Sequence, residues 1–216
     1  KKILTVCCIS KHVEDHVLEK STKINTQVLL NPVPLYWSKP IPRPLFDKKH
    51  INIGVLSRFS PQKNQLLLLN WLEHYQKKEI TIHFAGDGEL LRHAQELVAS
   101  SKFLSKHVIF YGMVEDIDDF FRKVDVCVQP SFYEGFGLSA TEAVARGIPL
   151  AYSRIPGLTQ VWGETEAAFE NTIESFDEII HYVITNRSNV FSSQFKMVQN
   201  FSQERHIKNL QAIYGS

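Results

Sequence analysis

The sequence predicts an α/β protein in which a parallel β-sheet is covered by helices on both faces. Three observations support this fold class. Short apolar strand-like runs alternate with segments of helical periodicity, the connections between them are short, and runs such as VDVCV (124–128) place apolar residues on both faces of a strand. Strands of this kind need a layer of helices on each side, and parallel neighbours need helical crossovers.

Composition limits the function classes. The 216 residues include 24 Lys and Arg against 23 Asp and Glu, which gives a formal net charge of +1, and 44% are hydrophobic. A sizeable core is therefore expected, and wholesale disorder is excluded. The balanced charge argues against a nucleic-acid partner. The longest aliphatic run, 66–69, is far too short to span a bilayer, and the N-terminus lacks a signal-peptide layout, so we expect a soluble protein.

The three cysteines, Cys7, Cys8 and Cys127, lie in apolar strand-like runs. This pattern is typical of buried free thiols in a reducing compartment. We therefore expect a cytoplasmic location.

A proline-rich segment divides the chain unequally. Five of the nine prolines lie in NPVPLYWSKPIPRP (31–44), so we expect a semi-rigid linker over 34–50. Before it, residues 1–33 predict one βαβ unit: a buried strand in KILTVCCIS, a helix Lys11–Lys20 capped by Ser10, and a strand in TQVLL. This unit is too small to bury a core unaided.

After the linker, one domain is predicted over 51–190. The expected strands are INIGVL (51–56), ITIHFAG (80–86), HVIFYG (107–112), DVCVQPS (125–131) and IPLAYS (148–153). Helices are expected from Pro61 and over about 89–100, 115–124 and 138–146. Further helices are expected over about 176–184 and 195–214, outside the sheet, with 191–216 as a C-terminal helical segment.

Ligands of parallel sheets bind at the carboxyl ends of the strands, so the loops that follow strands are the candidate sites. After the first strand of the main domain, Arg58 and Lys63 stand five residues apart at a helix start, where free amides favour anions. Arg can hold two phosphate oxygens, and Lys adds a compact second charge. The predicted ligand group is a diphosphate, and the alternative is a pair of solvated surface cations.

The loop after the second strand contains Gly86, Asp87 and Gly88. Glycines allow a backbone to approach a ligand closely, although a tight turn alone would also use them. Leu91 stands where a dinucleotide fingerprint would have its third glycine.

The stretch PSFYEGFGLSATEAVARGIP (130–149) places Glu134 in a loop and Glu142 on the following helix. Between them, Phe136, Gly137 and Leu138 offer backbone amides at a helix N-terminus. Two carboxylates that accept hydroxyl hydrogen bonds suit a ligand that is phosphate at one end and polyol at the other. The alternative is two solvated glutamates flanking a turn.

Taken together, these motifs resemble the C-terminal, donor-binding domain of the retaining GT-B glycosyltransferases of family GT4, the glycosyl transferases group 1. Their order and spacing match over about 51–160. The leading segment, with Ser10 and Asn31, Pro32 and Val33, resembles the last βαβ unit of the family's N-terminal domain. The resemblance implies a Rossmann-like sheet and metal-independent transfer of a sugar, with retention, from a nucleotide-diphosphate sugar to a glycan, lipid or other acceptor.

The resemblance also implies individual roles. Arg58 and Lys63 would hold the donor diphosphate, Glu134 would bind the donor sugar, and these three form the expected catalytic group. Glu142 would bind the ribose. The remaining expected contacts are the amides of Phe136, Gly137 and Leu138 at the sugar, and Gly86, Asp87, Gly88 and Met113 at the base. The donor would be a UDP-sugar or a GDP-sugar, with no separate cofactor. Ser57 and Asn64 depart from the family, which favours glycine at both positions.

Most of the family's N-terminal acceptor domain is missing from this sequence, so we expect the chain to supply the donor-binding half of an enzyme. The implied partners are a nucleotide sugar and a glycan or lipid-linked acceptor held mainly by the missing domain, which could also attach to the inner face of the membrane. The implied setting is polysaccharide or lipopolysaccharide biosynthesis. The alternatives are a non-catalytic nucleotide-sugar-binding subunit of a split enzyme, and a GT-B epimerase or phosphorylase.

Two metal-like patterns are set aside. Asp116 and Asp118 form a D-x-D, but they begin an apolar-striped helix whose dipole favours acids there. His12 and His16 stand four apart on a predicted helix without a third ligand. We therefore predict no metal site.

Overall fold

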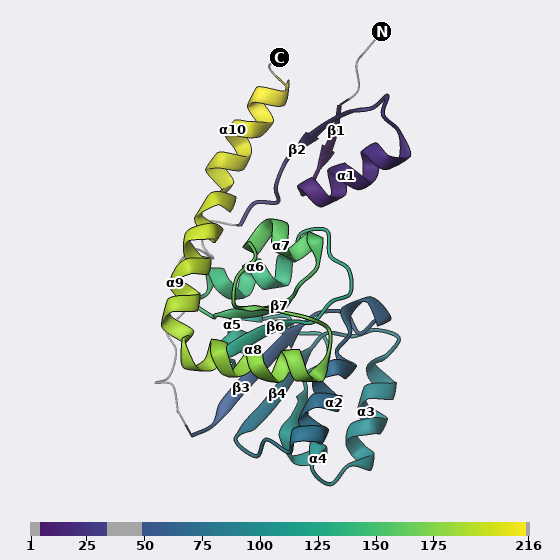
Figure 1. The fold of residues 1–216 in the computed structure, drawn as a ribbon, viewed down its shortest axis with the longest axis vertical. Helices are drawn as coiled ribbons and strands as arrows, with labels where there is room; N and C mark the ends of the chain where they lie inside the picture. Colours follow the sequence, from purple (N-terminus) through teal and green to yellow (C-terminus); the bar gives the residue numbers. More distant parts are fainter. Residues whose placement is uncertain (1–4, 34–48, 215–216) are drawn as a thin grey trace.

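In the computed structural model, which describes residues 5–33 and 49–214, a two-stranded sheet stands beside a larger six-stranded sheet (Figure 1). The smaller unit, called here the small lobe, contains β1 (Thr5–Cys8), α1 (Lys11–Lys20) and β2 (Asn25–Val28), with β1 and β2 parallel. The helix has the predicted bounds, and the Ser10 hydroxyl caps it by accepting from the Val13 amide at 3.2 Å. The linker predicted over 34–50 lies almost wholly outside the described residues.

The six-stranded sheet is parallel throughout and confirms the predicted fold class. Its strands are β3 (Ile51–Leu56), β4 (Ile80–Ala85), β5 (Val108–Phe110), β6 (Val126–Gln129), β7 (Leu150–Ser153) and β8 (Ala168–Phe169). Their order is β5-β4-β3-β6-β7-β8, so the chain runs outward in one direction from β3 and in the other from β6. The loops that follow these two neighbouring strands diverge and open a crevice at the carboxyl edge of the sheet.

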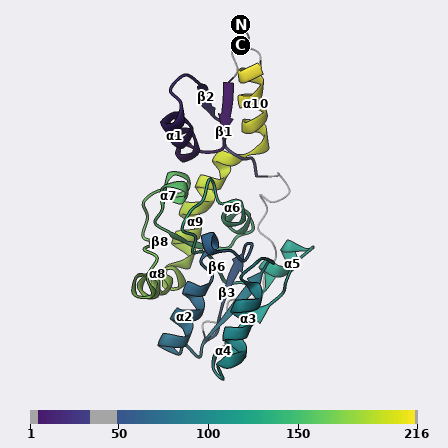
Figure 2. The ribbon, with the colours of Figure 1, turned by 90° about the vertical axis from the view of Figure 1, so that its right-hand side faces the viewer.

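Helices lie on both sides of this sheet (Figure 2). After the small lobe, the described part of the chain forms the helices α2 (Leu66–Tyr75), α3 (Leu91–Ser100), α4 (Leu104–His107), α5 (Ile117–Arg122), α6 (Leu138–Ala145), α7 (Pro156–Trp162), α8 (Ile173–Thr185), α9 (Arg187–Val198) and α10 (Gln203–Tyr214). On one side α2 packs against α8, where the Trp71 ring lies 4.9 Å from Phe176 and its indole N–H donates to Asp177 at 3.0 Å. Within the described ranges, no helix has the length and apolar character needed to cross a membrane.

The small lobe departs from the prediction of a buried first strand. Thr5, Val6 and Cys7 of β1 are exposed, and only Cys8 is buried. All three thiols are free, but only Cys8 and Cys127 are buried as predicted. Burial raises the pKa of the Cys127 thiol to about 12. Apolar character alone does not bury a strand, because burial also needs a covering element on each face.

Two predicted helices are divided. The helix expected from Pro61 begins only at Leu66, because Pro61–Lys63 form a 3₁₀ turn, η2, and Asn64 adopts a left-handed conformation with φ of 51°. The prediction that Lys63 lies at the start of an α-helix is therefore wrong. The helix expected over 195–214 is interrupted by a second 3₁₀ turn, η3 (Gln199–Phe201), and by the extended residue Ser202. The short elements α4, α7 and β8 were not predicted.

The C-terminal helix returns to the small lobe. Helix α10 runs beside this lobe in both views (Figures 1 and 2), and Nδ1 of His206 lies 2.8 Å from the Leu30 carbonyl oxygen. The Val33 amide donates to the Phe201 carbonyl at 2.6 Å. Helices α1 and α7 also touch, so the small lobe rests against the carboxyl edge of the large sheet.

A buried polar network crosses the sheet at His83 on β4. Its Nε2 lies 2.9 Å from Asn52 Oδ1 and its Nδ1 lies 2.9 Å from the Tyr111 hydroxyl. Asn52 in turn donates to Asp125 at 3.0 Å. Burial lowers the pKa of His83 to about 4, against the opposing effect of Asp125. The folded protein therefore holds this imidazole neutral.

We predict that His83 makes stability depend on pH. Between about pH 6.5 and about pH 4 the unfolded chain binds a proton at this imidazole that the folded chain does not bind. The free energy of unfolding should therefore be highest above that window and fall by up to about 3 kcal/mol as the pH drops through it. Urea denaturation across this range, compared with His83→Gln, isolates the contribution. An identical pH slope in the variant would contradict it.

Candidate functional site

Four chain segments enclose a cleft of about 550 Å³ at the carboxyl edge of the sheet. The segments are the loops after β3, β4 and β5 and the first turns of α6. Of the residues that the sequence singled out, the cleft brings together Arg58, Gly86, Asp87, Gly88, Met113, Leu138 and Glu142, with Leu56, Ser57, Ala85 and Ser139 completing its lining. The other four, Lys63, Glu134, Phe136 and Gly137, lie outside this lining.

The glycine turn after β4 is built against the loop after β3. Gly86 has φ of 132°, and a Cβ atom there would lie 2.1 Å from the Ser57 carbonyl oxygen. The Gly86 amide donates to the Gly112 carbonyl at 2.7 Å, and the Phe59 amide donates to the Asp87 carbonyl at 2.8 Å. Three loops are thus fixed to one another around the cleft, and glycine is required at 86 by both space and conformation.

Glu142 enters the cleft from α6, which begins after Gly137 in a left-handed conformation with φ of 79°. Burial raises the pKa of the Glu142 carboxyl, and the nearby Arg146 opposes that rise. Arg146 is only 2% exposed, and its Nε donates to Asp118 at 2.5 Å. This buried cation was not predicted, and it attaches α6 to α5.

The D-x-D aspartates have structural partners. Asp116 caps α5 by accepting from the amides of Asp118 and Asp119, and Asp118 pairs with Arg146. His12 lies beside Tyr133, with ring centroids 5.6 Å apart, while His16 is exposed. Among the residues that the structure describes, no group of three or more His, Cys, Asp or Glu side chains could hold a metal ion.

Glu134 forms a second cluster at the end of β6. Its carboxylate is buried, and Oε1 accepts three hydrogen bonds: from Lys63 Nζ at 2.5 Å, Gln129 Nε2 at 2.6 Å and the Ser131 hydroxyl at 2.7 Å. The structure therefore brings together Lys63 and Glu134, two of the three residues of the expected catalytic group. Gln129 and Ser131 were missed, although a polar pair at the end of an apolar strand was a visible signal.

Backbone ties keep Lys63 next to Glu134. The Phe132 amide donates to the Gln62 carbonyl at 2.8 Å, and the Gln62 side chain donates to the Tyr133 carbonyl at 2.8 Å. These two bonds join the η2 turn to the Glu134 loop. Asn64, which departs from the family's glycine, still adopts the left-handed conformation, and asparagine tolerates it better than most residues.

Asn171, just after β8, is hydrogen-bonded to residues of the same cluster and to its neighbours. Its amide donates to the Ser131 carbonyl at 3.2 Å, and its Oδ1 accepts from the Ser153 hydroxyl at 2.8 Å and from Asn64 at 3.3 Å. No motif pointed to this residue, because its partners are distant in the sequence. The Phe136 side chain lies in the core, with its ring centroid 5.2 Å from that of Phe201. Only its backbone amide could therefore contact a ligand.

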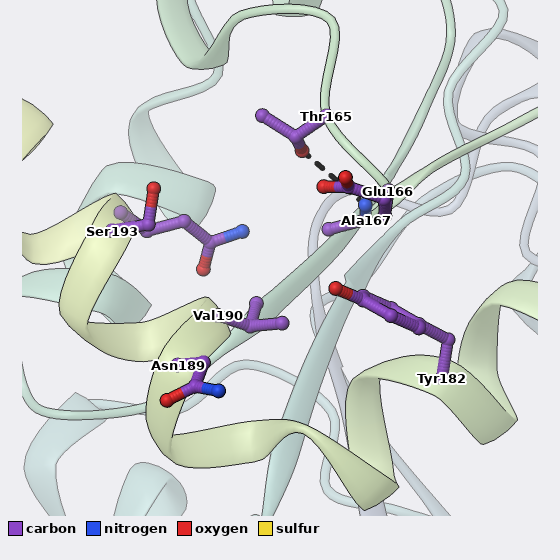
Figure 3. Close-up of a pocket in the computed structure, with 8 residues that line it drawn as sticks. Thr165, Glu166, Ala167, Tyr182, Asn189, Val190 and Ser193 are labelled. Atoms are coloured by element: carbon purple, nitrogen blue, oxygen red, sulfur yellow. Dashed lines mark hydrogen bonds between the residues drawn. The ribbon is translucent and has the colours of Figure 1, made fainter.

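A second cavity of about 220 Å³ lies between α8 and α9 near the start of β8 (Figure 3). Its lining is Thr165, Glu166, Ala167, Tyr182, Asn189, Val190, Ser193 and Gln194. None of these is a lysine or an arginine, and none was a candidate site residue. Because β8 is parallel to its neighbours, its start faces away from the carboxyl edge, and this cavity is separate from the cleft.

Comparisons with known proteins relate this sequence to glycosyltransferases. The family model for glycosyl transferases group 1 matches residues 40–204. EpsF of Bacillus subtilis is 37% identical over 103 residues, which are 47% of this chain and 27% of EpsF. The Escherichia coli UDP-Gal:alpha-D-GlcNAc-diphosphoundecaprenol alpha-1,3-galactosyltransferase is 25% identical over 170 residues, 74% of this chain and 44% of that enzyme.

The fold has close counterparts among solved structures. A mutant of S. aureus TarM, crystallised with fondaparinux, alpha-GlcNAc-glycerol and UDP, superposes with a TM-score of 0.80 at 21% identity. The match covers 98% of this chain and 44% of TarM. The chain therefore has the architecture of the C-terminal part of a GT-B glycosyltransferase, and it spans less than half of the length of each of these three proteins.

The close packing of Gly157 against the Glu134 loop leads to a prediction about stability. A Cβ atom at Gly157, in the first turn of α7, would lie 1.6 Å from the Glu134 carbonyl oxygen. Gly157→Ala must displace either α7 or the loop, and we expect the free energy of unfolding to fall by at least about 2 kcal/mol. Gly112→Ala is the matched control, because its Cβ atom meets nothing within 4 Å and only backbone strain of about 1 kcal/mol arises. Equal losses in urea denaturation would contradict the close packing.

Proposed function

This chain belongs to the family of glycosyl transferases group 1, and on that premise we propose that it carries the nucleotide-sugar site of a glycosyltransferase. The observation that supports this most is the cleft at the reversal of strand order, where Arg58, the 86–88 turn and Glu142 meet. A cation, a close backbone and a carboxylate suit a nucleoside diphosphate.

We assign the parts of the donor to the parts of the site. Arg58 and Lys63 hold the diphosphate, and the half-buried Glu142 accepts hydrogen bonds from the ribose hydroxyls. The base lies against the glycine turn and Met113, whose side chain is 77% exposed beside the cleft. UDP is the proposed nucleotide, because S. aureus TarM was crystallised with it; a GDP-sugar is the competing donor.

The transferred sugar is proposed to bind at Glu134, with the amides of Phe136, Gly137 and Leu138 completing its site. When the bond between the anomeric carbon and the diphosphate oxygen breaks, negative charge grows on the leaving nucleotide. Arg58 and Lys63 are proposed to stabilise that charge, and cations held in place for such a role can lower a barrier by several kcal/mol. Because these two residues can supply the counter-charge, we propose that transfer is metal-independent, and that it proceeds with retention as the resemblance implies.

The acceptor is proposed to bind mainly outside this chain. The chain matches less than half of the length of each of the three proteins named above, and the small lobe is proposed as the last part of an N-terminal acceptor domain, with 51–190 as the donor domain. The E. coli relative is named for transfer to a sugar on a lipid diphosphate. A glycan or lipid-linked acceptor at the cytoplasmic face of a membrane, in polysaccharide or lipopolysaccharide synthesis, is therefore proposed.

We expect Arg58→Ala and Glu142→Ala to weaken binding of UDP by about 1.5–3 kcal/mol each, the scale of hydrogen bonds to charged groups. Calorimetric titration with UDP and with GDP, with and without magnesium, measures this. Glu166→Ala, in the second cavity, is the matched control and should leave the affinity unchanged. Unchanged affinity in both cleft variants would refute the site, and magnesium-dependent binding would refute metal independence.

A further inference from the structure

Two residues with separate roles toward the donor are bound to each other. Lys63 Nζ lies 2.5 Å from Glu134 Oε1, and the two side chains are only 20% and 8% exposed. An ammonium group has three N–H donors, but one whose charge is already balanced by a carboxylate attracts a diphosphate less strongly than a free one does. Lys63 can therefore give its full charge to the diphosphate only if this ion pair opens.

Opening the pair would leave a buried carboxylate without its cation, which is costly unless other donors compensate. Gln129 and Ser131 are those donors, because both donate to the same Oε1 and are 2% and 0% exposed. Gln129 belongs to the last position of β6, so its backbone is fixed by the sheet. No described residue donates to Glu134 Oε2, so one oxygen is anchored and the other can accept hydroxyl groups of a sugar.

We propose that Lys63 is an exchangeable counter-ion, which neutralises Glu134 in the empty site and transfers to the diphosphate when the donor binds. Gln129 and Ser131 are positioning residues that hold the Glu134 carboxylate in both states. The inference rests on the proposed function, because it needs a diphosphate in the cleft. It adds a competition between an internal anion and the ligand for one cation.

This competition separates donor from product. When a nucleotide sugar binds, Glu134 loses its contact with Lys63 but accepts hydrogen bonds from the sugar hydroxyls. When a nucleotide diphosphate binds alone, Glu134 loses Lys63 and gains no new hydrogen bond. After transfer, Lys63 can pair again with Glu134, and this pairing favours release of the nucleotide. A site built this way holds the substrate better, relative to the product, than a site with a free lysine would.

A double-mutant cycle on UDP binding tests the exchange. Glu134→Gln keeps the shape of the side chain but removes its charge, so Lys63 becomes free and UDP should bind several-fold tighter, up to about tenfold. Lys63→Met should weaken UDP binding. In the Lys63→Met background, Glu134→Gln should then change the affinity by less than about twofold, because the cation under competition is gone.

Three outcomes decide against the proposal. If Glu134→Gln leaves UDP affinity unchanged or weakens it while Glu142→Ala weakens binding as predicted above, the proposed donor site stands and the exchange is wrong. If the gain persists in the double variant, it reflects direct repulsion between Glu134 and the phosphates. If the unaltered chain binds neither UDP nor GDP, the proposed function fails, and the exchange fails with it.

The positioning role has its own test, which does not depend on Glu134 variants. Gln129→Met preserves volume but removes the amide, so the open carboxylate is less well compensated and UDP should bind several-fold more weakly. The ratio of the dissociation constants for a UDP-sugar and UDP should rise about tenfold, since Glu134 is then less firmly held. UDP-glucose, UDP-galactose and UDP-GlcNAc are titrated, and the tightest is used. Equal weakening of UDP and UDP-sugar would show that Gln129 does not position the carboxylate for the sugar, and thermal unfolding confirms that the variant is folded.

Discussion

The reversal of strand order between β3 and β6 is the constraint on which the site depends. Because the chain leaves these neighbours in opposite directions, their following loops cannot cover each other, and a crevice opens at the carboxyl edge. The loop after β3 supplies Arg58 and leads to Lys63, and the loop after β6 supplies Glu134. The buried β-sheet fixes the starts of both loops, so groups distant in the sequence meet without a long ordered connection.

Buried polar groups of the larger sheet and its helices are compensated in different ways. Arg146 is balanced by Asp118 on α5, the Glu134 carboxylate by a lysine and two neutral donors, and His83 by remaining neutral. The Arg146 pair joins α6 to α5, whereas the carboxylate at the proposed sugar position is held partly by a long, partly exposed lysine.

Local sequence signals predicted much of the fold and part of the site. INIGVL and Lys11–Lys20 match their elements residue for residue, because apolar continuity and a serine cap act within a few positions. The prediction that β1 is buried was wrong. Burial of a strand depends on the helices or strands that pack over it, and the strand's own sequence does not contain that information. The helical periodicity of the sequence continues through Ser202. It therefore gave no sign of the break that separates α9 from α10. Asn171 could not be predicted, because its partners Ser131, Ser153 and Asn64 are distant in the sequence and only the fold brings them close.

The small lobe and helix α10 are both joined to the rest of the chain, at Val33 and at Ser202. These two positions lie side by side. Val33 forms an isolated parallel bridge with Ser202, and its amide is bonded to Phe201. Two segments fastened side by side behave as a double-stranded hinge. Rocking of the small lobe about an axis across both segments leaves their bridge intact, whereas twisting one segment past the other must break it. The bridge therefore favours joint bending of the two segments over sliding of one segment past the other.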